Sequence, residues 1–261
     1  MIKLIAVDLD GTLFNSESKI SIKNKSALER CRDNGIKVVI ASAKPAYSIS
    51  KIITELGLDA LHISYSGALI IDKDLKPVFE LKMEPEVCRG IILAGRIWKK
   101  GITLGLDDGI LYYEKEHPYN KIVIEVGDVI KKVKDLTVEK ICSRGLMFSI
   151  SAYENDSFED FLKEKFKNCR IKIMMGSPFS LIINHSDTSK IFALKKILEI
   201  YGISPDEAMA IGDSYTDISM ISEVGIGVAM GNAVPELKEA ADFIVPDNDS
   251  DGVATAIEKF V

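Results

Sequence analysis

The sequence lacks the patterns that mark disulfide-rich, zinc-binding and membrane-spanning proteins. Its four cysteines are widely separated and form no Cys-x-x-Cys pair, which argues against a disulfide framework and a zinc site. No apolar run approaches the roughly 18 residues that predict a membrane span, and no signal-peptide pattern follows the first methionine. We therefore expect a cytoplasmic protein with reduced, partly buried thiols and no membrane partner.

Histidine and tryptophan are also scarce, and acidic residues outnumber basic ones. The three histidines show no metal-ligand spacing, and we expect the single tryptophan, Trp98, to pack in a core rather than line a pocket. A formal net charge of −6 argues against nucleic acid as a partner, because proteins that bind the phosphate backbone carry a basic excess. The length of 261 residues, with 47% of them apolar, fits one large or two modest domains.

Strands and helices alternate at both ends of the chain. After a first strand that ends at Val7, the pattern predicts strands at 36–41 and 61–65 and helices at 26–34 and 45–56. Near the C-terminus it predicts strands at 208–211, 227–229 and 243–245 and helices at 188–201, 217–223, 234–240 and 253–260. We expect Ser186 or Asp187 to cap the helix at 188–201, and Gly202 to end it. This alternation implies parallel crossovers and an open parallel α/β sheet.

The middle of the chain has a different pattern. Asp107-Asp108-Gly109 predicts a hairpin between strands at 101–106 and 110–113, and Gly176-Ser177-Pro178 predicts another between strands at 170–175 and 179–184. A strand at 146–152 and helices at 85–100 and 156–167 complete an α+β module. We therefore predict that residues 1–82 and 185–261 form one domain and that residues 83–184 form an inserted one.

Two carboxylates follow the first strand, in Asp8-Leu9-Asp10-Gly11-Thr12-Leu13. Because side chains alternate faces along a strand, Asp8 and Asp10 can point to the same side. Two acids held this close repel each other, and the expected compensation is a divalent cation such as Mg²⁺, which prefers oxygen ligands. Taken alone, an Asp-x-Asp pair is typical of a surface strand that ends in an acidic turn, so the interpretation depends on the rest of the chain.

Further polar residues follow the other predicted strands. Ser42 follows the second strand, and Lys190 lies in the first turn of its helix. Asp213 and Asp217 follow the strand at 208–211. Since ligands of open parallel sheets bind beyond the carboxyl ends of the strands, we expect these side chains to meet in one cleft. Four acids, a hydroxyl and a lysine suit a metal-assisted reaction on a phosphate group.

In their order and spacing, these motifs resemble those of the haloacid dehalogenase superfamily of phosphatases, and specifically its Cof-type branch. The resemblance rests on Asp-x-Asp-Gly-Thr-Leu at 8–13 and Gly-Asp-x-x-x-Asp at 212–217, and it extends to Gly227-Val228-Ala229-Met230-Gly231-Asn232-Ala233. It implies a Rossmann-like core interrupted by an α+β cap at 83–184. It also implies a phosphatase that acts on small phosphorylated metabolites, with sugar phosphates as the expected substrates, as a monomer or homodimer.

The resemblance implies a role for each motif residue. Asp8 would be the nucleophile that becomes an aspartyl-phosphate, and Asp10 would protonate the leaving alkoxide and then activate water. Mg²⁺ would be held by the carboxylates of Asp8 and Asp213 and the backbone carbonyl of Asp10, with Asp217 in support. The phosphate oxygens would be bound by the side chains of Ser42, Lys190 and Thr216 and by backbone N–H groups around Ala43.

The chain departs from this branch at the site itself. Ser42-Ala43-Lys44 stands where Thr-Gly-Arg is usual, Ser66 and Thr216 where Asn is usual, and Ile191 where Gly is usual. Serine keeps the hydroxyl, but Lys44 loses the bidentate geometry of arginine. Two alternatives to the phosphatase stay open. One is a phosphotransferase like the related phosphomutases, and the other is a catalytically weakened protein that binds a phosphorylated ligand as a regulator.

Overall fold

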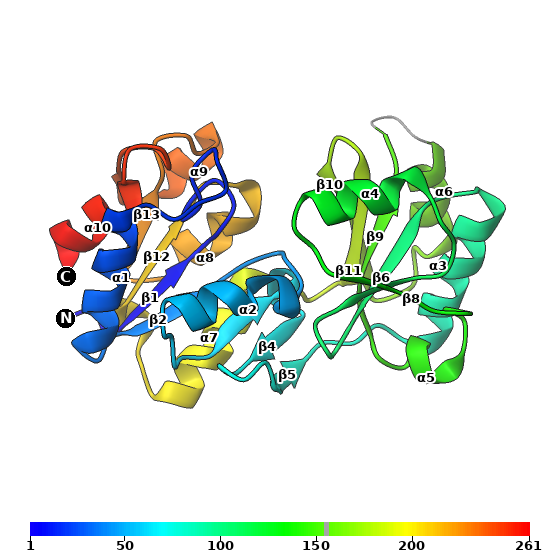
Figure 1. Cartoon of the computed structure of the whole chain (residues 1–261), viewed down its shortest axis with the longest axis horizontal. Coiled ribbons are helices and arrows are strands. Elements are labelled where there is room, and N and C mark those ends of the chain that lie inside the picture. The colour runs from blue at the N-terminus through cyan, green and yellow to red at the C-terminus, as the bar shows by residue number, and fades with distance from the viewer. Residues whose placement is uncertain (154–156) are drawn as a thin grey trace.

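The computed structural model describes residues 1–153 and 157–261, which form two units side by side (Figure 1). The parallel-sheet unit comprises the elements within residues 4–80 and 190–260, and the inserted unit comprises those within residues 85–185. Within the described ranges, no helix is both long and apolar enough to cross a membrane. The domain boundaries predicted from the sequence pattern stay a prediction.

Five parallel strands form the sheet of the parallel-sheet unit, in the order β14-β13-β12-β1-β2. They are β1 (Leu4–Val7), β2 (Lys37–Ile40), β12 (Ala208–Gly212), β13 (Ile226–Ala229) and β14 (Phe243–Ile244). The three inner strands are almost wholly buried, so the continuous apolar runs in the sequence are those of strands covered on both faces. Val7 lies opposite both Ile211 and Ile40, so the residues that follow β1, β12 and β2 share one edge of the sheet. The predicted open parallel α/β sheet is confirmed.

Six helices belong to this unit. They are α1 (Ile22–Asp33), α2 (Ala46–Glu55), α7 (Lys190–Tyr201), α8 (Ile218–Ser222), α9 (Pro235–Ala240) and α10 (Gly252–Phe260). The N-cap of α7 is Ser189, whose hydroxyl accepts a hydrogen bond from the Phe192 N–H at 3.1 Å. The prediction of Ser186 or Asp187 is wrong because the helix begins later, and Asp187 instead pairs with Arg170 at 2.6 Å. Gly202 ends the helix in the left-handed conformation, with φ of 64°, as predicted.

A small antiparallel sheet follows α2 and is only partly predicted from the sequence. It contains β3 (His62–Ser64), β4 (Leu69–Ile71) and β5 (Pro77–Glu80). The strands β4 and β5 were not predicted, because segments of three or four residues are too short to show a period. In β3, His62 is fully buried, and its Nδ1 accepts a hydrogen bond from the Ile40 N–H at 3.1 Å. Burial lowers the pKa of His62 to about 3, so this histidine is neutral and joins β3 to β2.

The inserted unit has a six-stranded sheet in the order β10-β11-β9-β6-β7-β8. Its strands are β6 (Ile102–Leu106), β7 (Leu111–Tyr113), β8 (Ile130–Lys132), β9 (Gly145–Ser151), β10 (Ile171–Ser177) and β11 (Ser180–His185). Its helices are α3 (Pro85–Ile97), α4 (Pro118–Glu125), α5 (Glu139–Cys142) and α6 (Ser157–Lys165).

Both predicted hairpins of the inserted unit are present. Because β10 continues to Ser177, the second turn lies at 178–179 rather than at 176–178. Three short elements, α4, β8 and α5, were not predicted from the sequence. The first residue of the helix predicted at 156–167 lies outside the described ranges.

Two apolar clusters stabilise the two units. The inserted unit has its own cluster, which includes Phe148 and Phe158. Trp98 packs on Phe158 with ring centroids 5.5 Å apart but is 36% exposed, so the prediction of a core position holds for only part of its ring. Tyr119 and Val123 of α4 instead join the larger cluster of the parallel-sheet unit, and this contact docks the inserted unit against its neighbour.

A strained turn follows β3. Tyr65, Ser66 and Gly67 have successive positive φ values of 50°, 56° and 105°. Glycine is required at position 67, because a Cβ there would lie 2.1 Å from the carbonyl oxygen of Ser189. The turn therefore packs directly against the N-terminus of α7. The left-handed conformation costs Tyr65 and Ser66 about 1 kcal/mol each, because neither is glycine.

We predict that the Ser66→Asn substitution stabilises the protein, because asparagine adopts the left-handed conformation more readily than serine. The expected gain in the free energy of unfolding is roughly 0.5–1 kcal/mol, measured by urea denaturation. Ser50→Asn, in the regular helix α2, is the control and should bring no gain. A loss of stability in Ser66→Asn would contradict the prediction.

Candidate active site

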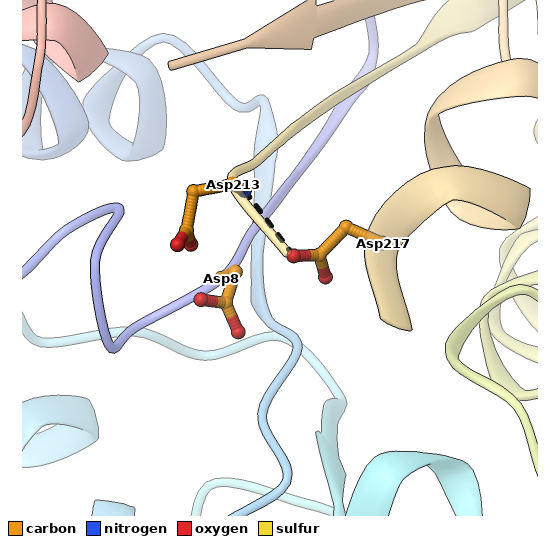
Figure 2. Close-up of side chains that lie close together, drawn as sticks. All are labelled: Asp8, Asp213 and Asp217. Carbon is orange, nitrogen blue, oxygen red and sulfur yellow. Dashed lines mark hydrogen bonds between the residues drawn. The ribbon is translucent and has the colours of Figure 1, made fainter. Parts of the chain in front are cut away.

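Three aspartates meet at the carboxyl edge of the parallel sheet. Asp8 directly follows β1 and Asp213 directly follows β12, and these two strands are paired neighbours. Asp217 comes from the short turn just before α8. Each of the three contributes a carboxylate oxygen, and these oxygens all lie within 4.8 Å of one another. Figure 2 shows the three side chains close together, with a carboxylate oxygen of Asp217 bonded to the backbone N–H of Asp213.

Two glycines make this convergence possible. A Cβ on Gly11, which has φ of +83°, would lie 2.4 Å from Asp213 Oδ2. A Cβ on Gly212 would lie 2.6 Å from Cβ and Cγ of Asp217. Any larger residue at either position would displace a carboxylate. The glycine of each sequence motif is therefore needed for the close approach of an acid as well as for the turn.

Lys190 neutralises part of this charge. Its Nζ lies 2.5 Å from Asp8 Oδ1 and 2.5 Å from Asp217 Oδ1, and the side chain is only 2% exposed. A lysine in the first turn of a helix is unfavourable with respect to the helix dipole. The two buried carboxylates offset that cost. Three acids and one lysine still leave the cluster with an excess negative charge when all four groups are ionised.

The electrostatics of the site follow from this crowding. Burial raises the pKa of Asp8 well above its usual value, the Lys190 charge opposes that rise, and the Asp217 charge adds to it. Burial also raises the pKa of Asp213, although the Thr12 hydroxyl, which donates to Asp213 Oδ1 at 2.7 Å, opposes the rise. Burial alone would lower the pKa of Lys190, but its two carboxylate partners raise that pKa above the usual value.

The carboxylates differ in which oxygens are already bonded. Asp217 is fully buried, and its Oδ2 accepts hydrogen bonds from the backbone N–H of Asp213 at 3.2 Å and of Ser214 at 3.0 Å. Its Oδ1 is taken by Lys190. Among the hydrogen bonds of the described residues, none ends on Asp8 Oδ2 or Asp213 Oδ2. These two oxygens are therefore the ones available to a cation, and Asp217 holds the loop and the lysine in place.

The remaining predicted residues lie around this cluster. The side chain of Asp10 is 60% exposed, stands outside the three-acid group and forms an ion pair with Lys44 Nζ at 3.6 Å. Ser42 is buried one residue past the bridge that joins Ala41 to β3, and its Oγ accepts the Lys44 N–H at 3.1 Å. Ala43 is exposed beside it. Thr216 is also exposed and pairs with the Ser214 hydroxyl at 2.9 Å.

Some residues that shape the site were not given a role by sequence reasoning. Thr12 fixes Asp213, and Asn232 Nδ2 donates to the carbonyl of Gly11 at 2.8 Å, which holds the loop after β1. Both residues lie in motifs that carried the family resemblance, so the sequence pointed to these positions but not to the hydrogen bonds that they make. The contact of Gly67 with the N-cap of α7 left no recognisable signal in the sequence.

Comparisons with known proteins agree with this geometry. A family model described as haloacid dehalogenase-like hydrolase matches residues 5–257. The chain is 33% identical over 261 residues to a 5-amino-6-(5-phospho-D-ribitylamino)uracil phosphatase of Bacillus subtilis (strain 168), covering 100% of this chain and 96% of that protein. It is similar to the crystal structure of a haloacid dehalogenase-like hydrolase from Bacteroides thetaiotaomicron, with 32% identity, a TM-score of 0.92 and 100% of both chains covered. A second structure from that organism, the phosphatase BT1666, has 27% identity, a TM-score of 0.83 and coverage of 100% and 95%.

We predict that Lys190→Met destabilises the metal-free protein by about 3–5 kcal/mol at neutral pH, because it leaves two carboxylates buried without their cation. Part of the loss should be recovered as the pH falls through the raised pKa of Asp8, because protonation removes the uncompensated charge. The measurement is urea denaturation at several pH values.

The control for this prediction is Lys195→Met on the same helix. Lys195 is 53% exposed and pairs with Glu223 at the surface, so its loss should cost no more than about 1 kcal/mol. Equal costs for the two substitutions would show that the buried ion pairs of Lys190 contribute little to folding.

Proposed function

This chain belongs to the haloacid dehalogenase-like hydrolase family, and on that premise we propose that it is a Mg²⁺-dependent phosphatase of small phosphorylated metabolites, sugar phosphates in particular. The observation that carries the proposal is the cluster of buried Asp8, Asp217 and Lys190 with half-buried Asp213 at the carboxyl edge of the sheet. The Bacillus subtilis relative supports the substrate class, since its name specifies a phosphate ester on a ribityl chain. The buried, free cysteines suit a reducing compartment, and we propose the cytoplasm.

The donor set at the site fits a divalent cation. Its free atoms are carboxylate oxygens, which hard cations such as Mg²⁺ prefer to nitrogen or sulfur. Asp8 Oδ2 and Asp213 Oδ2 would hold the ion together with the backbone carbonyl of Asp10. The excess negative charge of the cluster is of the sign that such an ion would neutralise. When bound, the cation would offset the repulsion between the anionic phosphate and the carboxylates.

Asp8 and Asp10 would divide the chemistry between them. With Oδ2 of Asp8 given to the cation, its Oδ1, which Lys190 contacts, would attack phosphorus, forming an Asp8 O–P bond while the P–O bond to the alcohol breaks. Asp10 would donate its proton to the departing alkoxide. A water molecule would then attack the aspartyl-phosphate and give its proton to Asp10, which releases inorganic phosphate and regenerates Asp8.

Other side chains would bind the phosphate oxygens. Lys190 already contacts the proposed nucleophile, and its ammonium group would also stabilise charge on the transferring phosphoryl group. The Ser42 Oγ accepts a hydrogen bond from the backbone and keeps its own proton to donate. Thr216 and the backbone at Ala43 lie on the exposed rim and would complete the set.

We also propose that the inserted unit is a cap that excludes water and selects the alcohol. It docks through backbone and side-chain contacts at the tip of its hairpin. Tyr47 N–H donates to the carbonyl of Gly109 at 3.0 Å. The ring of Tyr65 reaches Gly105 of β6, where a Cβ would lie 2.7 Å from the ring. A docked lid of this kind would keep bulk water away while the phosphoryl group passes to Asp8.

We predict that Asp8→Asn abolishes turnover of p-nitrophenyl phosphate and of a panel of sugar phosphates while the fold survives, because the amide cannot act as a nucleophile. Steady-state phosphate release with and without Mg²⁺ is the measurement. Release of free phosphate distinguishes a phosphatase from a phosphotransferase, which would produce a new ester instead. A wild-type protein that binds phosphate but turns over none of these esters would favour the regulatory alternative.

We predict that Mg²⁺ raises the melting temperature, and more so at about pH 8 than at about pH 5. Folding raises the pKa of Asp8 and Asp213 above their usual 3.8, so the metal-free folded chain binds more protons than the unfolded chain. Its stability therefore falls as the pH rises from about 4 through the raised pKa values. The cation replaces those protons, and at a hundred times its dissociation constant it would add about 2.7 kcal/mol.

Thermal unfolding of two variants checks the assignment of the ion to this site. Asp213→Asn should lose the shift because it removes a proposed ligand. Asp59→Asn, which changes an exposed aspartate paired with Lys37, should keep it. An undiminished shift in Asp213→Asn would place the ion elsewhere.

A further inference from the structure

Among the described residues, Lys44 is the one lysine whose ammonium group contacts both Asp10 and the inserted unit. It lies in the loop between β2 and α2, and its side chain is only 16% exposed. Its Nζ donates to the carbonyl of Val126 at 2.9 Å and lies 3.6 Å from Asp10 Oδ1. Val126 belongs to the inserted unit, and Asp10 belongs to the parallel-sheet unit. The two contacts therefore connect the units through one charge.

The position of Val126 explains why a lysine is favourable here. Val126 is the C-cap of α4, where the last carbonyl groups have no partners inside the helix. The C-terminus of a helix carries a partial negative charge that attracts cations. Lys44, which belongs to the parallel-sheet unit, thus caps a helix of the inserted unit. Because Tyr119 and Val123 hold α4 against the apolar cluster of the parallel-sheet unit, this cap forms only while α4 is docked.

Asp128 adds a second acid on the same side of the junction. It follows α4 by three residues, and its Oδ1 is buried without a hydrogen-bond partner among the described residues. Burial raises the pKa of Asp128, and the nearby Lys44 charge opposes that rise. Lys44 therefore contacts a carbonyl of the inserted unit and Asp10 of its own unit, and the Asp128 carboxylate of the inserted unit acts on its charge from a longer distance. The electrostatic pull on its ammonium group is shared between the two sides.

We propose that Lys44 is a positioning residue that orients Asp10 toward the leaving group when α4 is docked. The inference rests on the proposed function, in which Asp10 protonates the departing alcohol. A compact ammonium group with three rotatable donors can serve the helix terminus and the carboxylate at once. When α4 leaves, Lys44 loses Val126 and Asp128, and its pair with Asp10 becomes an exposed ion pair that contributes little. Docking of the inserted unit is thereby coupled to the placement of the acid.

The test compares two esters of similar shape that differ in how much they need an acid. Phenyl phosphate releases a phenol with a pKa near 10, like that of tyrosine, whereas p-nitrophenyl phosphate releases a far better leaving group. The parameter is kcat/KM, which covers the steps up to departure of the phenol. A misplaced acid slows the poor leaving group more, because general acid catalysis is worth roughly 10²–10⁴-fold only where a proton is needed.

Lys44→Met should lower kcat/KM for phenyl phosphate by roughly ten- to a hundredfold and that for p-nitrophenyl phosphate by less than about threefold. Lys44→Gln, which keeps a polar end, serves as a second variant of the same kind and should behave alike. Lys44→Arg keeps the charge and should restore the ratio of the two values to near that of the wild type.

The matched control is Lys82→Met. Lys82 also joins the two units, since it pairs with Glu80 at 2.5 Å and with Asp107 of the inserted hairpin at 3.3 Å, but neither contact involves Asp10. If Lys44 acted only by tethering the inserted unit, Lys82→Met would change the ratio of the two substrates in the same way. We expect Lys82→Met to leave that ratio unchanged.

The outcomes separate this inference from the proposed function. A wild-type enzyme that hydrolyses both esters, with Lys44→Met equally slow on both, would overturn the positioning role and leave the phosphatase standing. A ratio that changes to the same extent in Lys82→Met would also overturn it. A wild-type protein that hydrolyses neither of these esters nor any of the sugar phosphates with Mg²⁺ present would refute the proposed function, and this inference with it.

Discussion

The burial of Lys190 between Asp8 and Asp217 is the interaction on which the rest of the candidate site depends. Without the ammonium group, two carboxylates would face each other in a nearly dry environment, at a cost that few other contacts could offset. With the ammonium group bound to Oδ1 of Asp217, the second oxygen, Oδ2, is free to accept hydrogen bonds from the backbone of the loop after β12. That loop carries Asp213, so the lysine indirectly fixes an acid that it does not touch.

The class of fold could be predicted because buried parallel strands leave a strong signal. The apolar runs before Asp8 and Asp213 are strands with both faces covered, and the motif that follows each gave the site its location. The same reasoning failed for short elements such as α4 and β8, whose few residues show no period. It also misplaced the N-cap of α7. Ser186, Asp187 and Ser189 can all cap a helix through a side-chain oxygen, and which of them does so depends on where the backbone becomes helical.

Within the site, residue types could be predicted but not their partners. Lys190 was expected to face phosphate oxygens, and it does lie in the cluster, yet its pairing with Asp217 depends on how α7 packs beside α8. Lys44 was noted only as a departure from arginine. Its bond to Val126 arises between segments 82 residues apart and needs the docked position of a helix that the sequence did not reveal. Contacts of this kind are properties of the tertiary structure.

The strained turn at 65–67 has a mechanical consequence for the return crossing between the units. Only four residues separate the end of β11, at His185, from Lys190, and Lys172 of β10 holds the carbonyl of Thr188 within that crossing. A tilt of the inserted sheet would therefore pull on the start of α7. Gly67 packs directly against the carbonyl group of Ser189, at the point where this pull would reach α7. The residue before Lys190 is thus held from the parallel-sheet unit as well as from the inserted one, so the position of the lysine does not depend on the crossing alone.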